Sequence, residues 1–406
     1  MSISGNRNVG AHVLLFPVPT MSGHTIPILD LAKKLISRVL NITVLVTPST
    51  QHLLNSIQNQ LIPHHSNSLQ SLVLSIPEPL NSSMAAEIRA ASERYSPILE
   101  WFQSHPSPPV AIISDFFLGW TQKLATGLNI PRIVFWPAAA LPSLILNSLW
   151  ENISDFVNVS NANTIFSFPN IPNSPVYPLW QIDVMSSKFK KGDPAWEFVT
   201  ESFLSNYKGW CAVYSTFEQL EGVFLDAVKK EMGHHRVWGV GPFFHPPPMM
   251  ISVVGPVCAA VLTSGQVGSL AAALECSGVH FIWRVNAAEC GLIPQGYEDQ
   301  VAGREGLANG VMILTWPIQA DQFLNARFLV DDIGVAIKAC EGGKQTIPEP
   351  GKLAEVFVQS IKSDHPKREL VRRLFDMAKR AAEDQGSSSK DLDALVQQLN
   401  ELKFKN

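Results

Sequence analysis

Short and almost continuously apolar runs alternate with amphipathic stretches along the first half of the chain, and this alternation restricts the fold more than any other feature. The runs are HVLLFPV, ITVLVTP, LVLSIP, VAIISDFF and RIVFWP, each followed by turn residues. Stretches with helical spacing, such as IPILDLAKKLISRVL, lie between them. Strands that alternate with helices form parallel sheets, and nearly continuous apolar strands are covered on both faces. The sequence therefore predicts an α/β fold around a parallel sheet.

A proline-rich segment divides the chain of 406 residues into two predicted domains. The three consecutive prolines of GVGPFFHPPPMM cannot lie in a helix or a central strand, so we interpret residues 243–255 as a linker. Residues 1–242 and 256–385 then form two α/β domains. Residues 386–406 are predicted to form a terminal helix that Ser389 caps, because apolar residues recur there at helical spacing.

Charge and cysteine content exclude several classes of protein. Charged residues make up 16 % of the chain and the formal net charge is -4, which argues against a nucleic-acid-binding protein. The five cysteines include no CxxC pair, which favours free thiols in a reducing compartment over a disulfide framework or a zinc site. The apolar runs are shorter than the ~18 residues that a membrane-spanning helix needs. We therefore expect a cytoplasmic protein without a membrane span.

A histidine follows the first predicted strand at the position where α/β proteins bind ligands. In FPVPTMSGHTIPILDLAKKL, His24 lies on a glycine-containing loop that opens a helix, with Pro27 predicted in the first helical turn. A helix N-terminus disfavours the imidazolium form, so the ring stays neutral and basic at pH 7. His24 is therefore a candidate general base. The alternative is a loop histidine that only hydrogen-bonds to the backbone.

Asp115 ends another apolar strand, in PPVAIISDFFLGW, and is the candidate partner of His24. A carboxylate there can orient an imidazole and stabilise its protonated form. Asp115 can equally cap a short helix, and both roles can hold at once. No GxSxG beside a strand, no GxGxxG and no GxxxxGK[ST] is present, which argues against nucleophile-elbow hydrolases, dinucleotide oxidoreductases and P-loop enzymes.

A polar cluster follows a later strand, in TWPIQADQ. Gln319, Asp321 and Gln322 lie where the strand turns into a helix, and polar groups at such a turn commonly face a ligand.

Together these segments resemble the plant UDP-sugar-dependent glycosyltransferases of small phenolics, in particular the flavonol 7-O-glucosyltransferase branch. The likeness rests on GHTIPILDLAKKL, PPVAIISDFFLGWT, GDPAWEF, GHHRVWGVGP, SGVHFIWRV and TWPIQADQFLNARFLVDDIGVAI, and covers nearly the whole chain in order. The resemblance implies a GT-B fold, with two facing Rossmann-like domains. The first domain would bind a small phenolic acceptor and the second a UDP-sugar. It implies inverting transfer by a monomer, with no metal and no cofactor besides the UDP-sugar co-substrate.

The resemblance also implies roles for five residues. His24 matches the base that deprotonates the acceptor hydroxyl, and Asp115 matches its carboxylate partner. Asp321 and Gln322 match the pair that hydrogen-bonds the sugar hydroxyls, and Gln322 favours glucose. Glu305 matches the glutamate that binds the ribose hydroxyls.

The chain departs from the family pattern at the nucleotide. Members carry a base-stacking tryptophan and a phosphate-binding HCGWNS run before the glutamate, whereas here DQVAGR runs directly into EGLANG. A second phosphate-binding turn, Phe-Gly-Ser, is missing between residues 243 and 266. We therefore predict an internally deleted donor-binding signature and a truncated second domain. A second hypothesis follows, in which the chain binds the phenolic acceptor but no longer uses a UDP-sugar.

Overall fold

A seven-stranded parallel sheet forms the centre of the first half of the molecule. The computed structural model describes residues 10–18, 21–58, 68–81, 83–157, 159–182, 189–243, 262–279 and 312–403. In the order β3-β2-β1-β4-β5-β8-β9, the strands are β1 (His12–Phe16), β2 (Asn41–Val46), β3 (Leu69–Val73), β4 (Ala111–Asp115), β5 (Arg132–Trp136), β8 (Cys211–Tyr214) and β9 (Val237–Gly239). The predicted parallel sheet is confirmed, although β3 begins three residues before the apolar run LVLSIP.

Helices cover both faces of this sheet, as the nearly continuous apolar strands predicted. Val13 and Leu15 of β1 pack with α1, α2 and α15, whereas Leu14 and Phe16 point to the opposite face and pack with α3, α5, α6, α9 and α10. The helices of this half are α1 (Ser22–Ile36), α2 (Gln51–Gln58), α3 (Met84–Ser92), α4 (Tyr95–Ser104), η2 (Phe116–Leu118), α5 (Thr121–Gly127), α6 (Ala140–Glu151), α7 (Ile153–Val157), α8 (Leu179–Ile182), α9 (Pro194–Leu204), η4 (Asn206–Lys208) and α10 (Glu218–Met232). Strands β6 (Ile165–Ser167) and β7 (Val176–Pro178) form an antiparallel hairpin just before α8.

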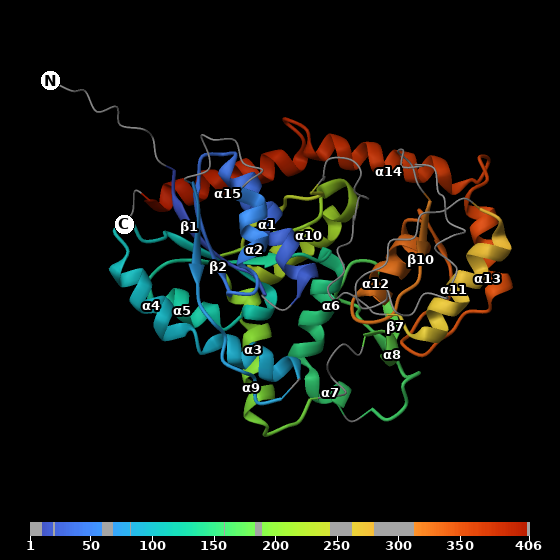
Figure 1. Cartoon of the computed structure of the whole chain (residues 1–406), viewed down its shortest axis with the longest axis horizontal. Helices are drawn as coiled ribbons and strands as arrows, with labels where there is room; N and C mark the ends of the chain where they lie inside the picture. The colour runs from blue at the N-terminus through green and yellow to red at the C-terminus, as the bar shows by residue number, and fades with distance from the viewer. Residues whose placement is uncertain are drawn as a thin grey trace.

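The second half of the molecule, on the right in Figure 1, is built around a smaller sheet in its described part. Its elements are α11 (Ser264–Ser277), β10 (Ile313–Thr315), α12 (Gln322–Arg327), the π-helical turn η7 (Phe328–Asp332), β11 (Ala336–Lys338), α13 (Pro350–Ser360) and α14 (Lys367–Ala382). Strands β10 and β11 pair in parallel, and α11 packs against α13. Both strands lie within the apolar runs VMILTWP and GVAIKA. None of the helices in the described ranges combines the length and apolarity that crossing a bilayer requires.

The chain returns to the first half through α15 (Ser387–Lys403), which runs beside the large sheet (Figure 1). Leu392, Leu395 and Leu399 pack into the same core as β1 and α1. The side chain of Asn400 accepts a hydrogen bond from the backbone N–H of Ala11 at 2.9 Å. The prediction that Ser389 caps this helix is wrong, because the helix begins at Ser387 and Ser389 lies buried within it.

A buried glutamate caps the helix that follows β5. The carboxylate of Glu221, on α10, accepts hydrogen bonds from the backbone N–H groups of Ala140 at 2.8 Å and Leu141 at 3.0 Å. These are the first residues of α6, whose donors have no partner inside the helix. Burial raises the pKa of Glu221, and the two hydrogen bonds oppose that rise. Glu221 thus fixes the start of α6 to α10.

Substitution of Glu221 by alanine is expected to lower the free energy of unfolding by about 2–5 kcal/mol, because it leaves two buried N–H groups unsatisfied. Glu221→Gln keeps one carbonyl acceptor and is expected to cost less. Urea denaturation followed by circular dichroism measures both. The matched control is Glu218→Ala, which removes an exposed glutamate from the same helix. An equal loss in both alanine variants would contradict the capping role.

Candidate functional site

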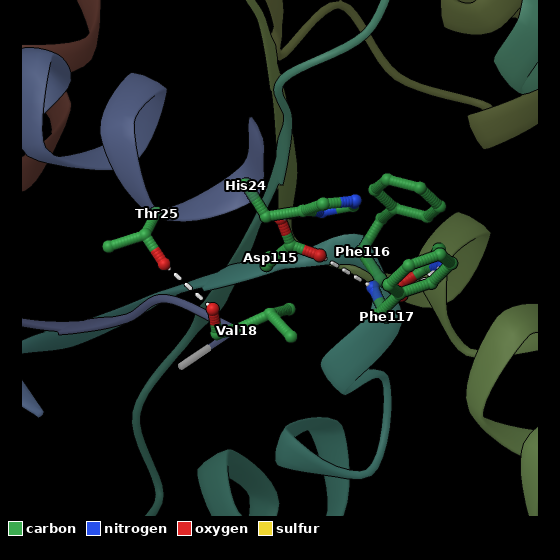
Figure 2. Close-up of polar contacts among 7 residues, drawn as sticks. Val18, His24, Thr25, Asp115, Phe116 and Phe117 are labelled. Carbon is green, nitrogen blue, oxygen red and sulfur yellow. Dashed lines mark hydrogen bonds and ion pairs between the residues drawn. The ribbon is translucent and has the colours of Figure 1, made fainter. Parts of the chain in front are cut away.

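His24 and Asp115 meet at the carboxyl end of the large sheet. His24 Nδ1 lies 2.8 Å from Asp115 Oδ2, and both side chains are fully buried (Figure 2). Asp115 is the last residue of β4, and its other oxygen, Oδ1, accepts the backbone N–H of Phe117 at 2.9 Å. Asp115 therefore contacts His24 and caps the short helix η2 at the same time. The hypothesis that His24 hydrogen-bonds only to the backbone is wrong.

The helix that carries His24 begins earlier than the sequence predicted. Helix α1 starts at Ser22, so His24 is its third residue and does not lie on a preceding loop. Pro27 consequently lies inside the helix, not in its first turn. Thr25 holds the entry to the helix, because its hydroxyl donates to the carbonyl of Val18 at 2.7 Å (Figure 2). The imidazole is thus fixed by both the helix and the strand.

The carboxylate determines which nitrogen of His24 is free to act as a base. An ionised carboxylate only accepts hydrogen bonds, so it places the proton of a neutral imidazole on Nδ1. Nε2 then carries the lone pair. In the described part of the structure Nε2 is buried and has no hydrogen-bond partner. A buried nitrogen with an unused lone pair is suited to take a proton from a bound hydroxyl.

Aromatic rings enclose the imidazole. The ring of Phe117 stacks on His24 with 4.7 Å between centroids, and Phe116 lies at 5.5 Å. Phe116 in turn stacks on Trp136 at 4.2 Å. Trp136 is only 3 % exposed and also stacks on Tyr214, so it packs in the core. These rings keep water from the histidine.

Asp321 lies in the second half of the molecule but interacts electrostatically with His24. Its Oδ2 accepts a hydrogen bond from Asn325 at 2.9 Å, whereas Oδ1 is buried without a partner among the described residues. Burial raises the pKa of Asp321 to about 7, against the opposing effects of the Asn325 hydrogen bond and the charge of His24. Asp321 Oδ1 is therefore an acceptor that no described residue uses.

Gln322, the first residue of α12, is bound to its own turn. Its Oε1 accepts the backbone N–H groups of Ile318 at 2.7 Å and Gln319 at 3.2 Å. Ala320, which directly follows Gln319, has a φ of 56°, a left-handed conformation that is uncommon for residues other than glycine. This turn leads directly into Asp321 and α12. Glu305 lies outside the described residues.

Helix α12 joins the two halves through shared packing. Leu324 and Phe328 belong to the same apolar core as β1 and α6. The ring of Phe323 meets Trp180 of α8 edge-on at 5.1 Å. Arg327 lies over the ring of Tyr177 at 4.8 Å and donates a hydrogen bond to the Val176 carbonyl. These contacts hold α12, which directly follows Asp321, against the first half of the molecule.

Two contributors to the site were not predicted from the sequence. Asn325 lies one helical turn after Asp321, a spacing that could have indicated the hydrogen bond between them. Phe117 stacks on His24 and has no comparable signal, because an apolar residue after a strand predicts only core. Within the described ranges no three His, Cys, Asp or Glu side chains group as ligands for a metal ion.

Relatives match the chain over nearly its whole length. It is 37 % identical, over 465 aligned residues and 97 % of each chain, to flavonol 3-O-glucosyltransferase UGT89B1 of Arabidopsis thaliana. It is 34 % identical to UDP-glycosyltransferase 89B2 of Stevia rebaudiana, over 97 % of this chain and 98 % of that one. No protein-family model matches the chain.

Solved structures share the architecture. UGT89C1 of Arabidopsis thaliana superposes with a TM-score of 0.72 at 26 % identity, over 96 % of this chain and 99 % of that one. The same protein has been solved in complex with UDP and with quercetin. These neighbours have the GT-B fold, so the predicted architecture of two Rossmann-like α/β domains is confirmed.

Proposed function

Because the chain belongs to the plant UDP-glycosyltransferases, we propose that it transfers glucose from a UDP-sugar to a hydroxyl group of a flavonoid or another small phenol, with inversion at the anomeric carbon. One observation carries this proposal more than any other. His24 is held by Asp115 at 2.8 Å while its Nε2 remains buried and without a partner. That arrangement is suited to a general base.

The proposed reaction needs no metal ion. His24 Nε2 takes the proton of the acceptor hydroxyl, whose oxygen forms a bond to the anomeric carbon as the bond to UDP breaks. The histidine becomes an imidazolium, which the carboxylate of Asp115 stabilises. The dry aromatic surroundings strengthen that electrostatic interaction.

Asp321 and Gln322 are the proposed contacts of the sugar. The unpartnered Oδ1 of Asp321 can accept a hydrogen bond from a sugar hydroxyl. Gln322 has its carbonyl oxygen bound to the turn, so it would bind sugar through its amide N–H groups. We propose Glu305 as the contact of the ribose.

The relatives support the substrate classes. A relative that covers nearly the whole chain is named a flavonol 3-O-glucosyltransferase, and UGT89C1 has been solved with the flavonol quercetin. A flavonol 7-O-rhamnosyltransferase of Arabidopsis thaliana is less similar, at 27 % identity. We therefore propose glucose over rhamnose and a flavonoid as acceptor.

Binding of the nucleotide is the part of this reaction for which the chain lacks expected residues. An alignment of 465 residues exceeds the 406 residues of this chain, so the relative has segments without a counterpart here. We propose that one of them is the uracil- and phosphate-binding segment before Glu305. Its loss removes charge-assisted hydrogen bonds worth about 1.5–3 kcal/mol each. This favours a second candidate function, in which the chain binds the phenol without transferring sugar.

Titration calorimetry with UDP is expected to show binding weaker than micromolar, because the proposed deletion removes charge-assisted hydrogen bonds to the nucleotide. Micromolar binding would contradict the proposed deletion of the donor site.

A turnover assay separates the two functions. With radiolabelled UDP-glucose at millimolar concentration and a flavonol, transfer that disappears in His24→Ala supports the transferase. If the unaltered chain shows no transfer but the flavonol still quenches its tryptophan fluorescence, the chain is an acceptor-binding protein.

A further inference from the structure

A fully buried arginine lies beneath the turn that carries Asp115. Arg132 is the first residue of β5, and its side chain has no exposed surface. Its hydrogen-bond partners among the described residues are the neutral side chains of Ser114 and Asn206. Burial lowers the pKa of Arg132 to about 9, and the charge of Asp115 opposes that change. A buried cation of this kind is costly unless other groups compensate it.

One arm of the Arg132 guanidinium reaches the end of the turn through two hydroxyls. Arg132 Nε donates to Ser114 Oγ at 2.8 Å, and Ser114 Oγ lies 2.8 Å from Thr121 Oγ1. Thr121 Oγ1 donates to the carbonyl of Leu118 at 2.6 Å. The donors can all point the same way, so each hydroxyl accepts one hydrogen bond and donates the next. This arm fixes the last residue of η2.

The other arm reaches the start of the same turn through an amide. Arg132 Nη2 donates to Asn206 Oδ1 at 3.0 Å. Asn206 Nδ2 donates to the carbonyl of Phe116 at 2.9 Å. Asn206 is also buried, so both of its contacts are shielded from water. The guanidinium thereby holds η2 at both ends.

We propose that Arg132 is a positioning residue for the base, which aims the Asp115 carboxylate at His24 by holding the η2 turn through Ser114 and Asn206. This proposal rests on the proposed function of the His24–Asp115 pair. Asp115 lies between Ser114 and Phe116, and both of these neighbours are held by the network. A catalytic pair needs such support, because a misplacement of about 1 Å can lower a rate by roughly 10²-fold.

The test uses an NMR signal of the His24–Asp115 pair that does not depend on turnover. The proton between His24 Nδ1 and Asp115 Oδ2 is expected to give a low-field imidazole resonance in NMR spectra of the full chain, assigned by its loss in His24→Ala and Asp115→Ala. In Arg132→Met this resonance is expected to vanish or broaden. The amide of Phe117, bound to Asp115 Oδ1, is expected to lose protection from hydrogen exchange. Arg132→Lys can make one of the two contacts and is expected to restore part of both signals.

Arg94 provides a matched control. It is a buried arginine, 2 % exposed, whose Nε donates to the carbonyl of Ala91 at 3.2 Å at the junction of α3 and α4. Arg94→Met is expected to lower stability but to keep the low-field resonance. If both methionine variants lose the resonance equally, Arg132 acts only through general stability and the proposal is wrong.

Two milder variants keep the test decisive if Arg132→Met does not fold. Ser114→Ala and Asn206→Ala each remove one arm, and each is expected to weaken the resonance and the Phe117 protection. Full signals in both, or in a folded Arg132→Met, would overturn the proposal.

Steady-state kinetics of the same variants provide a second, separate test. If the unaltered chain is active, Arg132→Met is expected to lower kcat about 10-fold or more with little change in the acceptor KM. Absence of turnover in the unaltered chain would count against the proposed function alone, because the resonance still decides the role of Arg132.

Discussion

Replacement of His24 by alanine is expected to lower the rate of glycosyl transfer by roughly 10²–10⁴-fold, the usual contribution of a general base. The phenol must lose its proton as it attacks, and Nε2 of the histidine held by Asp115 is buried without a hydrogen-bond partner among the described residues. Asp115→Ala is expected to lower the rate as well, because the imidazolium then loses its carboxylate. The measurement is transfer of radiolabelled glucose from UDP-glucose to a flavonol at saturating acceptor.

His52→Ala is the matched control for this experiment. His52 is exposed on α2, and its Nδ1 contacts the carbonyl of Ser49 at 2.7 Å, away from the His24–Asp115 pair. Its replacement is expected to leave the rate unchanged. Turnover that persists in His24→Ala would show that another group deprotonates the acceptor.

The second large effect concerns stability. Asp321→Asn is expected to stabilise the protein, and the gain is expected to increase with pH. Burial raises the pKa of Asp321 from 3.8 to about 7, although the Asn325 hydrogen bond and the charge of His24 lower it. The folded protein therefore retains a proton that the unfolded chain releases. Stability linked to this proton is fully present below pH 3.8 and is lost as the pH rises to about 7.

The size of the effect follows from the width of that pH window. Each pH unit within it corresponds to about 1.4 kcal/mol, so the total reaches about 4 kcal/mol at most. Asparagine does not titrate and can still accept the hydrogen bond from Asn325. Between pH 5 and pH 8, the stability advantage of Asp321→Asn over the unaltered chain is expected to grow by about 2–3 kcal/mol.

Urea denaturation of both proteins at pH 5, 6, 7 and 8 measures this difference. Other groups with raised pKa values, such as Asp391 at about 6 and Glu231 at about 7, are present in both proteins and cancel in the comparison. Asp364→Asn, at an exposed aspartate, is expected to show no such trend. A difference that stays constant with pH would mean that Asp321 is already ionised in the folded protein.

The contact between His24 and Asp115 was predictable from the sequence, because it follows from the positions of the two residues at the ends of strands. His24 follows the apolar strand β1 and Asp115 ends the apolar strand β4, and the carboxyl ends of neighbouring parallel strands meet at one edge of the sheet. The two hypotheses for Asp115 both used its side-chain oxygens, and the structure gives one oxygen to each. The parallel sheet was also predictable, from short apolar runs that alternate with stretches of helical spacing.

Other features depend on contacts that no local pattern reveals. The Arg132 network joins side chains from β4, α5, β5 and η4, which are far apart along the chain. Nothing in the sequence indicated that Gln322 Oε1 accepts two backbone N–H groups beside the left-handed turn at Ala320. The starts of α1 and α15 were predicted too late in the sequence. The structure begins these helices at Ser22 and Ser387. In α1 no side chain marks the first turn, since Met21 precedes it without a side-chain cap.

The return of α15 to the large sheet has a consequence for biosynthesis. Leu392, Leu395 and Leu399 complete a core whose other members, such as Val13 and Leu15, are synthesised first. Until α15 has left the ribosome, α1 and α2 cover this face of the sheet only in part, and the apolar residues that α15 would cover stay exposed. The core around β1 is therefore complete only after α15 has been synthesised, and the growing chain is exposed to aggregation during that interval. A premature stop codon just before Ser387 would therefore leave the core around β1 incomplete, although every other element of that core would have been synthesised.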